Sequence, residues 1–189
     1  YYRVTTGFSP ETRMAASGYM DWNFILEQQA EHLPRDDHVL AVLEAESERT
    51  ALVFCKRTSH VQRLADVIEA AGNTVDTLYG SKRDYERTCR VLDRKVVKSG
   101  CGFNWKAVDM IVVAADVAGV GRSEDGNYFV QYLGRSMRRL DSVPVIYDLV
   151  DDNSTIKKHH RNRVAISKSE GGVCRGEVKQ GGTVATWTI

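Results

Sequence analysis

The chain has 189 residues, of which 42% are hydrophobic and 27% are charged, and its formal net charge is +1. This length suits one domain with a substantial apolar core, and the composition is ordinary for a globular protein. A net charge so close to zero excludes strong nonspecific attraction to nucleic acid, so any such affinity has to come from a local patch.

Cysteine usage and the ends of the chain narrow the class further. The four cysteines form no C-x-x-C pair and have no histidine at ligand spacing. This pattern argues against structural zinc and favours a reduced, cytoplasmic setting. No apolar run is long enough to span a bilayer, and no signal-peptide pattern opens the sequence, so we expect no membrane partner. The chain starts at Tyr1 without an initiator methionine, so we expect a fragment of a longer protein.

The first quarter of the chain predicts an extended arm followed by two helices. Residues 1–18 carry scattered Thr, Ser and Gly with little pattern, which is typical of a linker. Apolar residues recur at helical spacing over 19–33 until Pro34, and a second helix is expected over about 37–47. We therefore assign residues 1–48 to a linker arm and connecting helices.

Strands then alternate with helices. Strands are predicted over 51–55, 74–79, 109–114 and 144–150, and helices over 59–71, 85–97, 128–139 and about 154–167. This alternation implies a parallel sheet with right-handed crossovers, which defines an α/β domain over 49–170. Residues 171–189 contain two Gly-Gly pairs and alternate apolar with polar residues. They predict a terminal hairpin or a strand added to the sheet edge.

Two motifs near the end of this domain could carry chemistry. An apolar strand runs into a loop with Gly119 and Gly121, where glycine permits close backbone approach and exposed amides can bind an anion. Downstream, Gln131, Arg135 and Arg138 lie at i, i+4 and i+7, so on a helix they share one face. Two guanidinium groups on one face suit a triphosphate better than a protein core. For each motif alone, an ordinary turn or a solvated helix face is the competing interpretation.

Five segments, in this order, resemble the second RecA-like domain of superfamily 2 helicases and translocases, particularly the phage UvsW-like branch and its restriction-enzyme relatives. The segments are 50–60 (motif IV), 78–87 (the segment after it), 111–123 (motif V), 131–138 (motif VI) and 145–152 (the closing strand). The resemblance covers well over half of the chain. It implies a RecA-like parallel sheet flanked by helices, acting as the second motor lobe of a helicase.

The resemblance also implies a division of labour across a cleft between two lobes. This sequence has no G-x-x-x-x-G-K-[ST] motif, so a first lobe would bind most of the ATP and its Mg²⁺, and this chain alone should hydrolyse none. Arg138 would be the arginine finger that neutralises the leaving γ-phosphoryl group, and Arg135 would support the phosphate. The other nucleotide contacts implied are Gln131, Gly119, Gly121 and Ser123. No metal site is expected on this chain.

Nucleic acid would lie across both lobes, held by its sugar-phosphate backbone, so binding should be independent of sequence and sensitive to salt. The resemblance places the contacts in loops after three strands, at Lys56, Arg57, Thr58, Gly80, Ser81, Ala115 and Asp116. DNA is the expected substrate, with RNA as the alternative. The basic run 157–163 is expected to be a solvated helix face without a chemical role.

Two features depart from the family pattern. Ser123 stands where many helicases carry an aspartate, a change that the UvsW-like branch tolerates. Only residues 124–130 separate motif V from motif VI, where the family fits another strand and its loop. Either the sheet is one strand smaller there, or a segment is missing from the sequence.

The leading hypothesis is therefore the C-terminal motor lobe of an ATP-dependent helicase or translocase, encoded by a phage and acting in the host cytoplasm. A non-catalytic RecA-like module that binds nucleic acid or a partner protein is the alternative. A third interpretation uses Asp148, Asp151 and Asp152 as a magnesium site for a nuclease or phosphotransferase. It is the weakest of the three, because strand-end aspartates more often cap the following helix.

Overall fold

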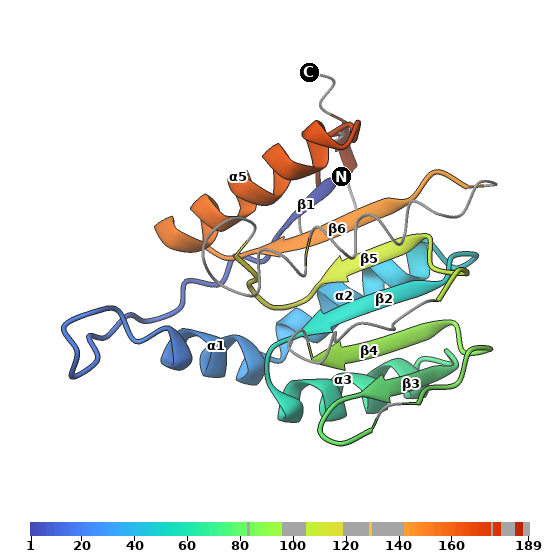
Figure 1. Cartoon of the computed structure of the whole chain (residues 1–189), viewed down its shortest axis with the longest axis horizontal. Coiled ribbons are helices and arrows are strands. Elements are labelled where there is room, and N and C mark those ends of the chain that lie inside the picture. The colour runs from blue at the N-terminus through green and yellow to red at the C-terminus, as the bar shows by residue number, and fades with distance from the viewer. Residues whose placement is uncertain are drawn as a thin grey trace.

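In the computed structural model, the described residues form one sheet of eight strands (Figure 1). The structure describes residues 1–82, 84–95, 105–118, 129, 142–174, 176–178 and 184–186. The strand order is β3-β4-β2-β5-β6-β1-β7-β8, and every neighbouring pair is parallel except β7 with β8. This arrangement confirms the predicted α/β class and its RecA-like parallel sheet.

The strands at the centre of the sheet are buried on both faces. β2 (Ala51–Cys55) and β5 (Met110–Val113) are uninterrupted apolar runs in which every residue is buried. β6 (Val145–Val150) pairs with β5, and β3 (Val75–Leu78) lies at the far edge. Strands that helices cover on both faces are largely apolar, which is why the sequence predicted β2, β5 and β6 correctly, although β6 carries Asp148.

Three helices lie close to their predicted positions. α1 spans Trp22–Glu31 and is capped by Asp21, whose carboxylate accepts a hydrogen bond from the amide of Phe24. α2 spans Pro34–Ala45 and starts three residues earlier than expected, because a proline in the first turn needs no amide hydrogen. α3 spans Thr58–Ala70. No helix in the described part of the chain combines the length and apolar character needed to cross a membrane.

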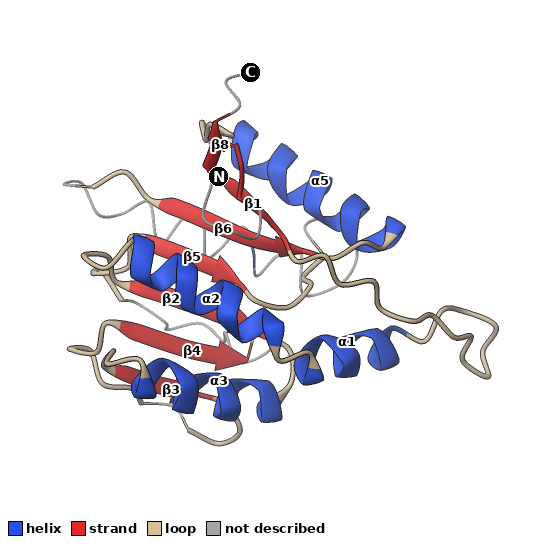
Figure 2. Cartoon of the chain, turned by 180° about the vertical axis from the view of Figure 1, so that it is seen from behind, coloured by secondary structure: helices blue, strands red, loops and turns tan. Residues whose placement is uncertain are grey.

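Helices cover both faces of the sheet. α2 and α3 pack on one face, and α5 (Ser154–Ser169) packs on the other (Figure 2). Val53 and Phe54 are neighbours on β2 but belong to different buried clusters, because successive strand side chains point to opposite faces. Leu43 of α2 lies in the Val53 cluster, and Val164 of α5 packs against the Phe54 cluster.

β4 (Val91–Lys95) lies where we predicted a helix over 85–97, so that prediction is wrong. It pairs with β2 on one side and β3 on the other, in the interior of the sheet. Asp93 and Arg94 are fully buried in the middle of this strand. These two charges interrupt the apolar run, and they made it look like part of an exposed helix.

β1 (Tyr2–Thr5) corrects the expectation that residues 1–18 form a linker arm. It is an interior strand between β6 and β7 and runs parallel to both. The ring of Tyr2 stacks on Tyr147 of β6, with 4.9 Å between ring centroids. A strand of four residues whose partner lies about 140 residues away has no local pattern that reveals it, because its burial comes from that distant pairing.

The end of the chain adds to the sheet as predicted. β7 (Gly176–Val178) pairs with β1, and β8 (Val184–Thr186) pairs antiparallel with β7. The tail is therefore a hairpin that extends the edge of the sheet.

Candidate functional site

The candidate site is the edge of the sheet where its parallel strands end. β2, β3, β5 and β6 all run in the same direction, so the segments that follow them meet at this edge. Open parallel sheets bind ligands there, because loops from several crossovers converge. The loops after β2, β3 and β5 carry every residue that the motifs assign to nucleic acid.

After β2, the chain passes through Lys56 and Arg57 directly into α3, which begins at Thr58. The side chain of Lys56 is largely buried. Arg57 turns towards α1, where its Nη2 donates to the main-chain oxygen of Asn23 at 3.0 Å and lies 3.3 Å from the Glu27 carboxylate. Arg57 thus ties α1 to the edge of the sheet, and a phosphate contact for these three residues stays a prediction.

After β3, the chain turns at Gly80 and exposes both Gly80 and Ser81. Gly80 has a φ of +60°, a left-handed conformation that favours glycine. Beneath this turn, the Asp76 carboxylate pairs with Lys82 and accepts the amide hydrogen of Glu86 at 2.7 Å. Burial raises the pKa of Asp76, but these donors outweigh it, and the pKa is lowered. The turn offers solvent a hydroxyl and main-chain groups, which is what contact with a nucleic-acid backbone uses.

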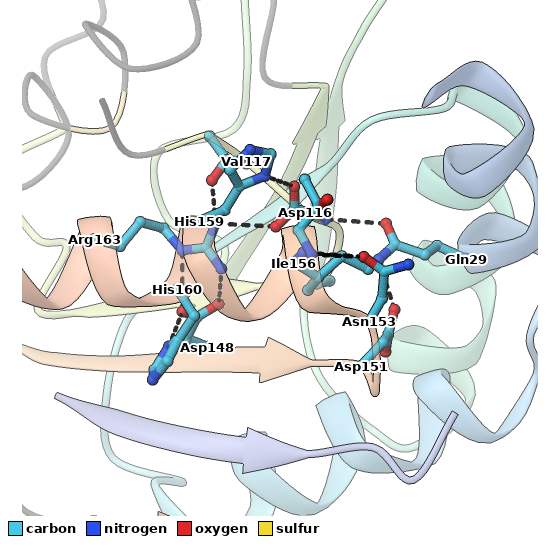
Figure 3. A network of polar contacts seen from close by, with 12 residues as sticks. Gln29, Asp116, Val117, Asp148, Asp151, Asn153, Ile156, His159, His160 and Arg163 are labelled. Carbon is cyan, nitrogen blue, oxygen red and sulfur yellow. Dashed lines mark hydrogen bonds and ion pairs between the residues drawn. The ribbon is translucent and has the colours of Figure 1, made fainter. Parts of the chain in front are cut away.

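After β5, Asp116 is fully buried, and its amide and both of its carboxylate oxygens contact protein partners (Figure 3). Its amide donates to Oε1 of Gln29 on α1 at 3.1 Å. One carboxylate oxygen lies 2.5 Å from Nδ1 of His159, and the other lies 3.1 Å from Nη1 of Arg163. Ala115 is buried as well. The predicted nucleic-acid contacts of Ala115 and Asp116 are untested, and in this structure the Asp116 carboxylate is directed towards α5.

Arg163 of α5 joins the ends of β5 and β6. Its Nε and Nη2 donate to the two carboxylate oxygens of Asp148 at 3.0 and 2.9 Å, and its Nη1 donates to Asp116 and to the main-chain oxygen of Val117. Burial alone would raise the pKa of Asp148, but Arg163 and His160 lower it to about 2. Burial likewise opposes the charge on Arg163, yet the carboxylates raise its pKa. Both side chains therefore remain charged inside the protein.

The inward face of α5 corrects the expectation of a solvated basic helix over 157–163. Arg163 is fully buried, and His159 and His160 each place Nδ1 against a buried carboxylate. Lys157 behaves as expected and pairs with Asp152 at the surface. The basic run is therefore split between a polar face that packs on the sheet and a solvated one.

A third buried carboxylate, that of Asp151 directly after β6, holds the connecting helices on this lobe. It accepts hydrogen bonds from Nε2 of Gln29 and from the hydroxyl of Thr6, both at 2.6 Å, and it pairs with Arg35 of α2. Nη1 of Arg35 also donates to the main-chain oxygen of Ala114 at 2.9 Å. α1 and α2 are thus built into this lobe through the same edge that carries the motif loops.

The three strand-end aspartates do not converge on one point. Asp148 and Asp151 each face a buried arginine, and Asp152 pairs with Lys157. Within the described ranges, no group of three or more His, Cys, Asp or Glu side chains is placed to hold a metal ion. A magnesium ion would have to displace an arginine from each buried carboxylate, so the geometry does not favour the nuclease interpretation. The helix after these aspartates is capped by Asn153.

Six predicted site residues lie outside the described residues: Gly119, Gly121, Ser123, Gln131, Arg135 and Arg138. The arginine finger, its supporting arginine and the glycine loop therefore stay predictions, and so does the shortened segment before motif VI. The described Phe129 is buried in the Phe54 cluster.

Sequence reasoning missed the buried polar side chains that organise this edge. One local signal was present: Ile156, Arg163 and Ser167 share one face of α5, and an arginine between an apolar and a small residue indicates a charge that faces the core. Its partners, Asp116 and Asp148, come from two different strands, and no local pattern identifies them.

A parallel sheet with helices on both faces, and with motif loops gathered at its carboxyl edge, defines the class of RecA-like lobes. Solved structures share this fold. UvsW of T4 is 16% identical with a TM-score of 0.65, over 94% of this chain and 41% of that one. S. cerevisiae Dbp5, solved with RNA and ADP BeF3, is also 16% identical, with a TM-score of 0.57 over 94% of this chain and 41% of that one. The C-terminal part of the Fun30 ATPase domain, 16% identical, gives 0.53 over 69% of this chain and 45% of that one.

The amino-acid sequence of the chain is similar to those of viral proteins. The chain is 34% identical to "Putative helicase 161L" of Invertebrate iridescent virus 6, over 92% of this chain and 42% of that protein. It is 32% identical to "Putative helicase 055L" of Frog virus 3, over 86% and 36%. The chain thus spans less than half the length of these relatives, and no family model matches it. These helicase-named relatives, together with the shared fold, support the C-terminal RecA-like lobe of a superfamily 2 helicase that the order of the motifs predicted.

Proposed function

We propose that the chain is the C-terminal motor lobe of an ATP-dependent helicase or translocase that grips the sugar-phosphate backbone of DNA. The observation that carries this proposal is the convergence, at one edge of a RecA-like sheet, of the loops that hold motifs IV and V. Dbp5, which shares the fold, was solved with RNA and a nucleotide analogue, which supports both ligand classes. Both helicase-named relatives are viral, which supports a viral protein; a phage origin and a cytoplasmic site stay predictions.

ATP would lie between this lobe and a first RecA-like lobe. Arg138 would neutralise charge on the γ-phosphoryl group as it leaves, and Arg135 would hold the phosphate. The remaining contacts would come from Gly119, Gly121, Ser123 and Gln131. Mg²⁺ would be held by the first lobe, because the buried carboxylates at this edge already pair with arginines. This lobe's own part is to hold these groups in place and to exclude water from the cleft.

The test joins this chain to the first lobe of the same protein and measures ATP hydrolysis with and without DNA. DNA should stimulate hydrolysis, and Arg138→Ala should reduce turnover about a thousandfold or more while DNA affinity stays within about twofold. Arg139→Ala is the matched control, because the motif gives Arg139 no role and, on the predicted helix, its side chain would point about 100° away from that of Arg138. Full turnover in the Arg138 variant would contradict the arginine finger.

The same protein separates the motor from its alternative, a non-catalytic interaction module. A module that binds nucleic acid would be stabilised by DNA in a thermal unfolding experiment but would hydrolyse no ATP. A module that binds only proteins would respond to neither ligand. Replacing DNA by RNA of the same sequence then decides which nucleic acid stimulates the motor.

A further inference from the structure

We propose that His159 and Arg163 of α5, together with Gln29 of α1, are positioning residues for the loop stem, which we define as residues 115–118. The loop stem leads from β5 towards the glycines of motif V. This inference rests on the proposed function, since it assigns to two distant helices the task of setting where the glycine loop of motif V begins.

The three side chains hold the loop stem at both main-chain and side-chain atoms. Gln29 accepts the amide hydrogen of Asp116 at 3.1 Å, and its own Nε2 donates to Asp151 at 2.6 Å, so both ends of its amide are fixed. Arg163 donates to the main-chain oxygen of Val117 as well as to the Asp116 carboxylate. His159 contacts the second carboxylate oxygen of Asp116 at 2.5 Å. Donors and acceptors on consecutive residues are thereby fixed by two helices (Figure 3).

The contacts from α1 and α5 restrain the loop stem more than its hydrogen bonding to the sheet does. β5 itself ends at Val113, and the amide of Ala115 still donates to the main-chain oxygen of Phe54 on β2 at 3.1 Å. Residues 116–118 lie beyond these contacts, where loops usually follow the solvent and move. Here Ala115, Asp116 and Val117 are all buried instead. Misplacing a reacting group by about 1 Å can reduce a rate by about a hundredfold. Because α1 and α5 hold the loop stem, the glycine loop of motif V would enter the cleft from a defined position.

His159 and His160 provide a matched pair for a test. Both lie on α5, their side chains are 20% and 13% exposed, and each places Nδ1 against a fully buried carboxylate. His159 contacts Asp116 of the loop stem, whereas His160 contacts Asp148 of β6 at 2.8 Å. Removing either imidazole should destabilise the lobe to a similar degree, but only the loss of His159 should release the stem.

The first experiment measures hydrogen exchange in the 189-residue chain. In His159→Ala, amides 116–118 should exchange about tenfold faster, as expected for the loss of a hydrogen bond to a charged group. His160→Ala should leave these amides unchanged. His159 also packs edge-on against Trp22, with 5.3 Å between ring centroids. His159→Asn restores a donor to Asp116 without the ring, so it should recover protection. Equal exchange in the two alanine variants, or no change in His159→Ala, would overturn the proposal.

The second experiment uses the chain joined to its first lobe. His159→Ala should raise the DNA concentration for half-maximal stimulation and lower kcat about tenfold, with KM for ATP within about twofold. His160→Ala should keep the wild-type DNA response, and a purely structural role would lower kcat in both variants without moving that response. If the wild type shows no stimulated hydrolysis while exchange behaves as described, the proposed function fails and the positioning of the stem stands. If the wild type is stimulated and His159→Ala keeps its DNA response, the positioning role is wrong.

Discussion

Two fully buried aspartates in the same sheet have pKa values that are shifted in opposite directions. Asp148 on β6 forms an ion pair with Arg163, and its pKa is lowered to about 2 although burial alone would raise it. Asp93 on β4 has no ion pair among the described residues; burial raises its pKa well above the ordinary value and outweighs the Cys55 thiol and the Arg94 amide, which lower it. Burial makes an acid neutral unless a partner of opposite charge is buried with it.

The comparison shows which part of the sheet is built for a task. β5 and β6 end in a network that ties α1, α2 and α5 to the motif loops. β4, separated from β6 by β2 and β5, carries its acid into the core beside the thiol of Cys55, whose pKa is raised by burial and by Asp93. Ion pairs between buried side chains, such as Asp148 with Arg163, thus lie at the candidate site, whereas the unpaired Asp93 lies in the interior of the sheet.

The largest effect should come from removing the arginine that keeps Asp148 charged. Arg163→Met leaves two carboxylates, those of Asp148 and Asp116, in the core without their guanidinium. Breaking a buried pair in this way costs about 3 to 5 kcal/mol of unfolding free energy, measured by urea denaturation at pH 7. Arg161→Met, at an exposed position of the same helix, is the control and should change stability by less than about 0.5 kcal/mol. Equal losses would show that the pairing is unimportant.

The second largest effect should come from acid, which removes the contribution of the charged Asp148 to the free energy of unfolding. Its folded pKa of about 2 lies below its ordinary value of 3.8, so this contribution is complete above about pH 4 and is lost as the pH falls through 2. The difference corresponds to about 2 kcal/mol at neutral pH. Urea denaturation between pH 2 and pH 5 measures it. A stability that stays flat across this range in the wild type, with Asp93→Asn as the background control, would show that Asp148 is not held charged.

Asp93 should respond in the opposite direction. Its folded pKa is raised, so the unfolded chain loses its proton first, and stability falls as the pH rises above the ordinary value near 3.8. Asp93→Asn removes this loss while keeping the shape of the side chain. The variant should gain stability over the wild type as the pH rises from 4 to 8, by about 1.4 kcal/mol for each unit between the two pKa values. A constant difference across this pH range would argue against a neutral Asp93.

These buried charges also explain where sequence reasoning succeeded. β2 and β5 were predicted because a strand covered on both faces is an unbroken apolar run, and β6 was predicted because apolar residues surround its one charge, Asp148. β4 was not, because Asp93 and Arg94 break its run, and a charged pair in a sequence normally indicates solvent. β1 was missed for a different reason, since its burial depends on β6, which follows it by about 140 residues.

The candidate site, like the fold, was predicted from the sequence only in part. The loops that follow β2, β3 and β5 were placed at one edge by the predicted parallel direction of their strands, because parallel strands end at the same edge. The side chains that hold those loops could not be placed. Arg163 reaches Asp116 across 47 positions, and Gln29 reaches it across 87, so each contact exists only after the sheet has formed. Motif patterns identify what a loop offers to a ligand, and tertiary structure decides what holds the loop.

The smallest stability effect should come from a charge at the same edge that stays in solvent. Arg57 is 30% exposed, and its partner Glu27 is 54% exposed. Such a pair contributes about 0 to 1 kcal/mol, so Arg57→Gln should barely change the urea midpoint, in contrast to Arg163→Met. If Arg57 contacts a phosphate, as motif IV predicts, the slope of log affinity for DNA against log salt should fall by about one in the protein that carries both lobes. Glu27→Gln removes the opposing negative charge beside the same guanidinium and should strengthen DNA binding. An unchanged slope in Arg57→Gln would remove Arg57 from the backbone grip and leave the edge to Gly80 and Ser81.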